Sequence, residues 1–172
     1  MKIKVVRTPP VFGVFSGHVT LYFSEINPFL QSHDTYNFDY MLRQETSLTK
    51  LPSHTEINFD RADENSVIFE SPVDINDFKK TIESSKFKNG QSFHGFRQNC
   101  VHAILFALEE AAQLDLNINK QSQSCKHLLW CCWGYTNIIT PKELIKLLQN
   151  SDNALASEST PILKKGVKIS NL

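Results

Sequence analysis

The clearest pattern of hydrophobic and polar positions in this chain is an alternation with period two over residues 14–23, which read VFSGHVTLYF. Val19, Leu21 and Phe23 fall on one face of this segment, and His18 falls on the other, more polar face. Successive side chains of a strand point to opposite faces of its sheet. The pattern therefore predicts a strand with one buried face and with His18 on the opposite face.

Two further segments predict strands. The segment HTEINF (54–59) alternates and puts Glu56 and Asn58 on the same face, whereas SVIFES (66–71) is a short apolar run that Pro72 ends. Short runs rich in β-branched and aromatic residues are typical of strands. The sequence thus predicts a small sheet built from these segments and from residues 14–23.

The strongest helical pattern runs from Cys100 to about Leu114. Apolar residues recur there near helical spacing and form one stripe: Val101, Ile104, Leu105, Leu108 and Ala112. Asn99 stands directly before this stripe. It is a good N-cap residue, because its side chain can accept a hydrogen bond from a free backbone N–H. The pattern predicts a helix that begins at Cys100.

Two more helices are predicted, one before and one after that segment. Residues 74–85 have apolar positions at helical spacing behind Asp74, a suitable N-cap. Residues 140–150 begin with Thr140 as N-cap and with Pro141 at the first helical position. Proline is favoured there because its missing N–H would have no partner in the helix.

The order of elements predicts the fold class. A short helix is expected around residues 38–43, but the chain otherwise runs from strands to helices. This order indicates an α+β fold in which a small antiparallel sheet packs against helices. We expect residues 1–150 to form a single domain. Residues 151–172 are polar and weakly patterned, which predicts a weakly structured C-terminal tail with a short strand at GVKI.

Composition narrows the function classes. The 172 residues suffice for one domain with a sizeable core. Eighteen basic and 18 acidic residues give a net charge of zero, which does not support a nucleic-acid or anionic-membrane partner. No segment approaches the roughly 18 apolar residues of a membrane span. There is no phosphate-binding glycine loop, EF-hand or H-E-x-x-H motif, so no cofactor is expected.

The same composition bears on localisation. The N-terminal MKIKVVRTPP lacks the apolar core of a signal peptide. Without such a signal, the four cysteines are expected to be reduced thiols. We expect a cytoplasmic protein, or one that is secreted without a classical signal peptide. The oligomeric state stays open.

Cys100 is the candidate nucleophile. It falls in the first turn of the predicted helix, where the helix dipole and free N–H groups favour a thiolate. It shares a stripe with Ile104, Ala107 and Ala111, so its side chain is expected to point towards the sheet. His18 on that sheet would be the base that a thiol nucleophile requires. The alternative is that Cys100 is a small core residue and His18 a surface histidine.

Further groups would complete such a site. A third residue usually orients the base histidine, and either Glu56 or Asn58 could accept a hydrogen bond from its ring N–H. The choice depends on strand register, which the sequence does not fix. The backbone N–H of Cys100 and a second donor would stabilise the oxyanion of an acyl intermediate. Gln98 and Tyr22 are the candidates for that donor.

The other histidines are weaker candidates. His102 lies two positions after Cys100, so it cannot face the thiol from within the same helix and is expected to pack or to lie at the surface. His94 precedes the helix and could approach the site. His33 is expected to be solvent-exposed in a loop.

A second cluster of metal-ligating residue types lies at Cys125, His127, Cys131 and Cys132. Their spacing, C-x-H-x3-C-C, lacks the C-x2-C knuckle of structural zinc sites. Adjacent cysteines also bind one ion with difficulty. We therefore expect these cysteines to be packing residues in an aromatic segment and expect no metal.

Two short motifs, GHVTLYF around His18 and NCVHAILFAL around Cys100, resemble those of the permuted papain-like cysteine enzymes. This group includes NlpC/P60-related amidases, the lecithin:retinol acyltransferase-like family and bacterial effector and toxin domains. NCVH is similar to the N-C-E-H motif of the acyltransferase-like branch, with Val101 in place of Glu. The segment before Cys100 and the helix start at Thr140-Pro141 also look like those of bacterial papain-like effectors. The resemblance covers roughly residues 13–150.

The resemblance implies a papain-like fold with a catalytic cysteine at a helix N-terminus. Cys100 would be the nucleophile and His18 the base, while the third residue is not carried over. It implies a cysteine hydrolase of the protease or amidase type that acts on a protein or peptide, as a bacterial effector or toxin. An acyltransferase or deamidase with the same pair is the alternative enzyme. A non-catalytic papain-like binding module is the alternative from another class.

Overall fold

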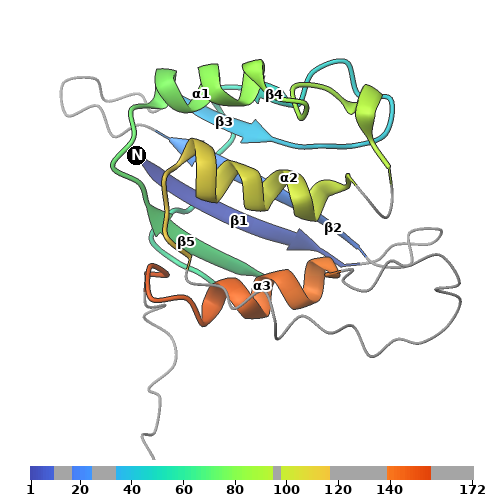
Figure 1. Cartoon of the computed structure of the whole chain (residues 1–172). Helices are drawn as coiled ribbons and strands as arrows, with labels where there is room; N and C mark the ends of the chain where they lie inside the picture. Colours follow the sequence, from blue (N-terminus) through green and yellow to red (C-terminus); the bar gives the residue numbers. More distant parts are fainter. Residues whose placement is uncertain (10–16, 25–33, 95–97, 117–138, 156–172) are drawn as a thin grey trace, which may run out of the picture.

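A five-stranded antiparallel sheet organises the molecule (Figure 1). The computed structural model describes residues 1–9, 17–24, 34–94, 98–116 and 139–155. The strands are β1 (Lys2–Thr8), β2 (His18–Ser24), β3 (Thr35–Phe38), β4 (Leu48–Lys50) and β5 (Ser66–Glu70). Their spatial order is β4-β3-β2-β1-β5. The predicted α+β class with a small antiparallel sheet is confirmed.

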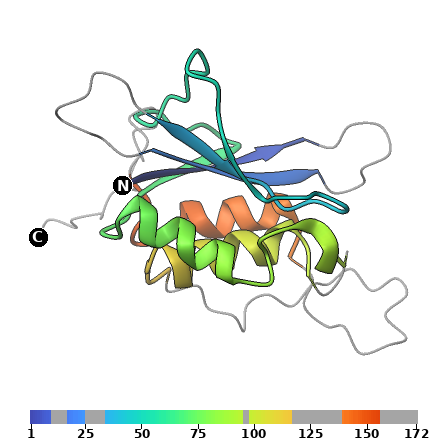
Figure 2. The same ribbon diagram turned by 90° about the horizontal axis from the view of Figure 1, so that it is seen from above.

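Three α-helices cover one face of this sheet (Figure 2). They are α1 (Ile75–Ser84), α2 (Cys100–Phe106) and α3 (Pro141–Gln149), with a short 3-10 helix, η1 (Gly90–Ser92), between α1 and α2. A π-helix, η2 (Ala107–Ala111), continues α2. The three predicted N-caps are confirmed: Asp74, Asn99 and Thr140 each accept a hydrogen bond from a backbone N–H of the helix that follows.

Every second residue along the middle of β1 and β2 is apolar, and these side chains form the sheet's part of the hydrophobic core. In the antiparallel pair, Ile3 lies opposite Phe23 and Val5 opposite Leu21, and all four side chains are fully buried. The helices bury their apolar stripes against this face. The fully buried helical residues include Phe78, Ile82, Ala103, Ala107, Leu108, Leu144 and Leu148. Burial of large aliphatic and aromatic side chains is the main favourable term in folding.

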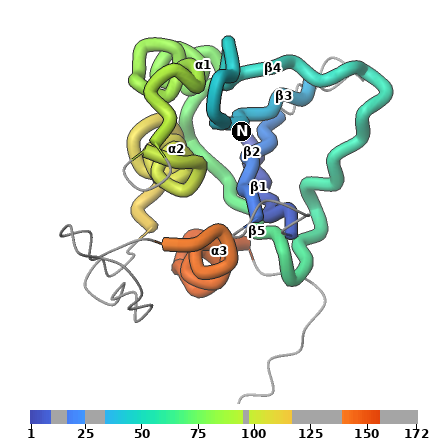
Figure 3. The backbone as a smooth tube through the Cα atoms, turned by 90° about the vertical axis from the view of Figure 1, so that its right-hand side faces the viewer, coloured from blue at the N-terminus to red at the C-terminus, as the bar shows by residue number. Residues whose placement is uncertain are grey.

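The other face of the sheet is covered by residues 51–65 (Figure 3). The Lys4 ammonium donates to the carbonyl oxygens of Asn58 and Arg61, each at 2.8 Å. The prediction of a strand at 54–59 is wrong, because this segment crosses the lysine-bearing face of β1 and makes side-chain contacts in place of a backbone ladder.

One further prediction needs correction. Residues 38–43 form no helix, because Phe38 ends β3 and a turn with Arg43 at a φ of 64° follows. β1 was not predicted, although Ile3 and Val5 alternate with lysines there. Residues 151–155 contact the sheet, since the Leu155 N–H donates to the Ile68 carbonyl at 2.9 Å. The GVKI segment lies outside the described residues.

None of the helices in the described ranges combines the length and the apolar character needed to cross a bilayer.

Candidate functional site

Cys100 is the first residue of α2, and a network at the helix start fixes its position. The Asn99 side-chain oxygen accepts from the N–H groups of Val101 at 3.0 Å and His102 at 3.3 Å. The α-helix continues into η2, so the helical segment behind Cys100 reaches Ala111. The Cys100 side chain is nearly buried, at 8 % exposure. Its backbone N–H belongs to the first turn, whose N–H groups have no acceptor within the helix.

His102 completes this cap. Its ring Nδ1 lies 2.9 Å from the Asn99 side-chain oxygen and 3.5 Å from the Asn99 backbone nitrogen. Burial, and to a smaller degree the positive Lys86, lowers the pKa of His102, so the ring is neutral at physiological pH. The histidine takes the place of the glutamate or glutamine that usually closes a capping box.

His18 reaches Cys100 from the first residue of β2. Gly17 precedes it with a φ of 76°, a left-handed conformation that glycine adopts without strain. The His18 imidazole hydrogen-bonds to the Cys100 thiol and, through Nε2, to the Asp39 carboxylate.

Asp39 follows directly after β3 and completes a Cys–His–Asp arrangement. Its backbone N–H donates to the Ser47 carbonyl at 2.8 Å, which closes the loop between β3 and β4. The side chains of His18 and Asp39 are 23 % and 20 % exposed, so the ion pair is largely sheltered from water. Figure 1 shows the start of α2, the start of β2 and the end of β3 at the same end of the molecule.

The environment of His18 favours its charged form. Burial by itself lowers the pKa of the imidazole. The hydrogen bonds to Asp39 and Cys100 and the negative charges of both groups outweigh burial and raise the pKa from 6.5 to about 9. His18 therefore carries a proton at neutral pH. An imidazolium beside a sulfur atom stabilises the thiolate, which is the nucleophilic form of cysteine.

Glu56 and Asn58, the residues predicted to orient the histidine, do not lie in this arrangement. Both are exposed, and the Asn58 side-chain oxygen accepts from the backbone N–H groups of Asp60 at 2.9 Å and Arg61 at 3.1 Å. Of the described residues, His18 hydrogen-bonds to Asp39 and Cys100, not to these two. The prediction depended on a strand at 54–59 that does not form.

Sequence reasoning missed Asp39 because the register of β2 and β3 is not visible in the sequence. In the sheet Leu21 lies opposite Phe38, which puts residue 39 level with the first half of β2. The available signal was a carboxylate directly after the short aromatic segment TYNF. That segment could have been recognised as a strand and Asp39 as a group at its end.

The two candidates for a second oxyanion donor both lie near this arrangement. Gln98 lies two residues before Cys100, and its side-chain amide donates to the Tyr40 hydroxyl at 3.0 Å. Burial, together with the negative charge of Asp39, raises the pKa of Tyr22, so its phenol stays neutral. Both residues carry N–H or O–H donors of the kind that stabilises an oxyanion.

The remaining candidates are His94, His33 and the second cluster of metal-ligating residue types. His94 is exposed and pairs with Gln98 through backbone hydrogen bonds of 2.8 and 2.9 Å. His33 and the cluster of Cys125, His127, Cys131 and Cys132 lie outside the described residues. In the described part of the chain, no group of three or more histidine, cysteine and acidic side chains is arranged to hold a metal ion.

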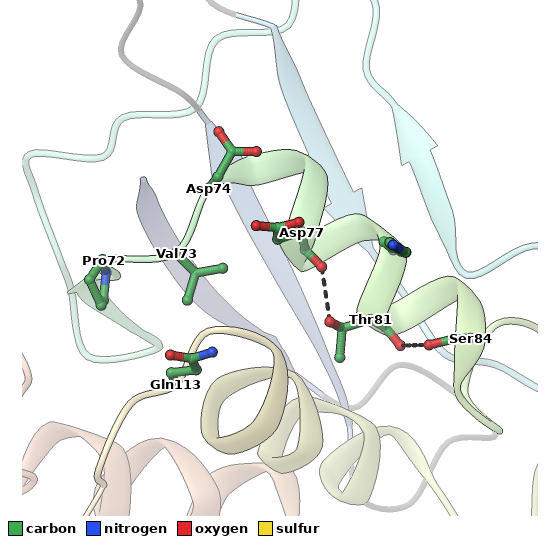
Figure 4. Close-up of a pocket in the computed structure, with 8 residues that line it drawn as sticks. Pro72, Val73, Asp74, Asp77, Thr81, Ser84 and Gln113 are labelled. Carbon is green, nitrogen blue, oxygen red and sulfur yellow. Dashed lines mark hydrogen bonds between the residues drawn. The ribbon is translucent and has the colours of Figure 1, made fainter.

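A groove of about 580 Å³ lies elsewhere, between α1 and the segment that follows η2 (Figure 4). It is lined by Pro72, Val73, Asp74, Asp77, Lys80, Thr81, Ser84 and Gln113. Its polar groups are used locally: Thr81 donates to the Asp77 carbonyl at 2.9 Å, and Ser84 donates to the Thr81 carbonyl at 3.0 Å. The groove contains no nucleophile paired with a base.

Comparisons with known proteins do not add a relative. No protein-family model, curated protein or solved structure matches this chain. The resemblance to permuted papain-like enzymes therefore depends on the sequence motifs around His18 and Cys100. The functional proposal depends on the arrangement of the side chains.

Proposed function

We propose that this protein is a cysteine hydrolase of the protease or amidase type, with a protein or peptide as substrate. One observation carries the proposal: the His18 imidazole lies between the Cys100 thiol and the Asp39 carboxylate. A nucleophile, a base and a group that orients the base form the constellation used for acyl transfer on several unrelated folds.

The first half-reaction follows from the protonation state of His18. With a pKa of about 9, the imidazole carries a proton at neutral pH. In the proposed mechanism, Cys100 reacts as the thiolate. The thiolate attacks the carbonyl carbon of the substrate, and the backbone N–H of Cys100 donates to the oxygen that becomes negative. His18 then gives its proton to the departing nitrogen or oxygen. The substrate bond breaks, and a thioester to Cys100 remains.

The second half-reaction regenerates the enzyme. His18 is now neutral and accepts a proton from a water molecule. The resulting hydroxide attacks the thioester carbonyl, the sulfur leaves as the thiolate, and the acid product departs. Asp39 holds the ring in one orientation through both steps. If an amine or alcohol takes the place of water, the same residues catalyse acyl transfer; if ammonia leaves a side-chain amide, they catalyse deamidation.

One observation favours the non-catalytic alternative. Cys100 is only 8 % exposed and packs in the same core cluster as Val101 and Ile104. A cysteine of this kind can act as a small apolar residue. In that case His18 and Asp39 would form a structural ion pair, and the surface around them would bind a partner.

Hydrolysis of activated esters and fluorogenic peptides separates these functions. The wild type is expected to release the leaving group in a burst followed by a steady rate, because an acyl-enzyme accumulates. Cys100→Ala and His18→Ala should lose at least about 10³-fold in rate. His94→Ala is the matched control, since this exposed histidine has no role in the mechanism. Full turnover by Cys100→Ala with an intact fold would overturn the proposal.

A further inference from the structure

Two apolar side chains are held out into solvent close to Asp39 in the chain. Met41 is 48 % exposed and Leu42 is 62 % exposed. Isolated exposed apolar residues are common and need no explanation. Two in succession, within three residues of a group that orients the candidate base, are a different case. Leu42 is three residues after Asp39, so the Cα atoms of these two residues can lie at most about 10 Å apart.

The turn that carries these side chains is fixed by hydrogen bonds. The Gln44 N–H donates to the Met41 carbonyl at 3.3 Å, and the Met41 N–H donates to the Gln44 side-chain oxygen at 3.0 Å. Arg43 adopts a φ of 64°, a left-handed conformation that is unfavourable for a residue with a side chain. The hydrogen bonds compensate for this local strain.

Direct backbone packing against η1 holds the turn from the other side. The Gly90 N–H donates to the Gln44 carbonyl at 2.7 Å. A Cβ atom at Gly90 would lie 1.8 Å from the Met41 carbonyl oxygen and 2.6 Å from the Gln44 nitrogen, so no other residue fits there. The position of the turn is thus set by its backbone. The side chains of Met41 and Leu42 remain largely exposed.

The turn is also tied to the start of α2. Tyr40 is buried next to the turn, and its hydroxyl accepts from the Gln98 amide at 3.0 Å. Figures 1 and 2 both show the loop between β3 and β4, η1 and the start of α2 at the same end of the molecule. The Met41–Leu42 turn therefore lies at the end of the molecule where a substrate carbonyl would meet the Cys100 sulfur.

We propose that Met41 and Leu42 form an apolar wall of the substrate site and select a peptide with an aliphatic side chain next to the scissile bond. This inference rests on the proposed hydrolase function. Two adjacent side chains on one turn offer about the area of one aliphatic residue, which is too little for a long acyl chain. Because hydrogen bonds already fix the backbone of this turn, it loses little conformational entropy when the substrate binds.

Ester hydrolysis tests the selectivity. The wild type should prefer the p-nitrophenyl ester of N-acetyl-leucine over that of N-acetyl-glycine by at least about tenfold in kcat/KM, since each buried methylene contributes about fourfold. The double variant Met41→Ser/Leu42→Ser should lose this preference. Leu155→Ser is the matched control, because Leu155 is 42 % exposed but lies at β5, on the opposite edge of the sheet.

Two results with esters would overturn the inference. One is a leucine preference that survives in the double variant. The other is a p-nitrophenyl octanoate rate that exceeds the leucine ester rate and falls in the double variant, which would identify an acyl chain as the occupant. Gly90→Ala moves the turn without changing either apolar side chain, and it should also reduce the preference.

A second measurement separates this inference from the hydrolase function. Cys100 should react faster with N-isobutylmaleimide than with N-methylmaleimide, relative to the same ratio for glutathione. The double variant should abolish that difference. If this pattern holds and no ester is hydrolysed, the apolar wall stands and the hydrolase function fails. If esters are hydrolysed without any leucine preference, the hydrolase function stands and the apolar wall fails. If Cys100 does not react and no ester is hydrolysed, both fail.

Discussion

The two ends of the helical segment from Cys100 to Ala111 use polar residues in different ways. At the first end, the imidazole of β2 hydrogen-bonds to the thiol of α2 and to the carboxylate after β3, so groups from three elements meet. At the other end, the groove beside Gln113 is lined by polar groups of α1 that bond within α1 itself. Convergence of groups from separate elements is the feature that distinguishes a candidate site from a polar surface groove.

A left-handed residue near each end of this segment has a different consequence. Gly17 takes a left-handed conformation just before His18, where it directs the chain into β2. Gln113 takes a φ of 52° just after the π-helix, where the Leu114 N–H donates to the Leu108 carbonyl at 2.9 Å. The second case is a helix-ending motif in which glycine is common. It therefore needs no functional explanation.

Replacing Asp39 should have the largest effect on catalytic activity. Asp39→Asn removes the negative charge that keeps His18 protonated and oriented, so kcat should fall by roughly 10²- to 10⁴-fold. Glu56→Gln and Asn58→Ala are the matched controls and should keep the wild-type rate. A loss of activity in Glu56→Gln with an unaffected Asp39→Asn would assign the orienting role to the other segment.

The charge of His18 should also make folding depend on pH. Its pKa is about 9 in the folded protein and about 6.5 in the unfolded chain, so folding favours the proton. This contribution to the free energy of unfolding is complete below about pH 6.5 and is lost as the pH rises through about 9. In urea unfolding at about pH 6 and about pH 9.5, the advantage of the wild type over His18→Gln should shrink at the higher pH. Parallel curves would contradict a charged His18.

Tyr40→Phe should have a smaller effect. The hydroxyl is the partner of the Gln98 amide, and its loss removes one tie between the β3–β4 loop and the start of α2. We expect a loss of about 1 kcal/mol in the free energy of unfolding and a several-fold decrease in kcat. An unchanged kcat with the expected loss of stability would limit this tie to a structural role.

Changes in the groove should have the smallest effect. Asp77→Asn and Lys80→Gln remove charges from exposed positions of α1 that line it. Activity and stability should stay within about twofold and about 0.5 kcal/mol of the wild type. A large loss of activity would mean that this groove, and not the end with Cys100, holds the substrate.

The helix N-caps and the strand with one buried face could be predicted from the sequence. Asn99 and Thr140 predicted helix starts because an N-cap is a local interaction within four residues. The strand at His18 was readable because one face is continuously apolar. Asp39 was not, since its role depends on which strands pair and in what register. The wrong prediction of a strand at 54–59 has the same cause. Alternation places Glu56 and Asn58 on one face of the segment, but it does not show whether another strand pairs with that segment.

The pairing of Cys100 and His18 was readable in part. Both residues were chosen from helix position, strand pattern and family resemblance, and the structure places them in hydrogen-bonding contact. His102 was correctly separated from the thiol by helical geometry, but its part in the cap was not foreseen. A histidine at that position closes a capping box only when its ring is neutral and turned back towards Asn99.

The most direct test of the Cys100–His18–Asp39 unit is the rate of Cys100 alkylation by iodoacetamide at neutral pH. Trypsin cuts after Arg97 and Lys120, so the peptide 98–120 reports Cys100 without the other cysteines. The rate should fall at least about tenfold in His18→Gln, fall less in Asp39→Asn, and stay unchanged in His94→Ala. Equal rates in all four proteins would contradict a thiolate–imidazolium pair and make Cys100 a packing residue.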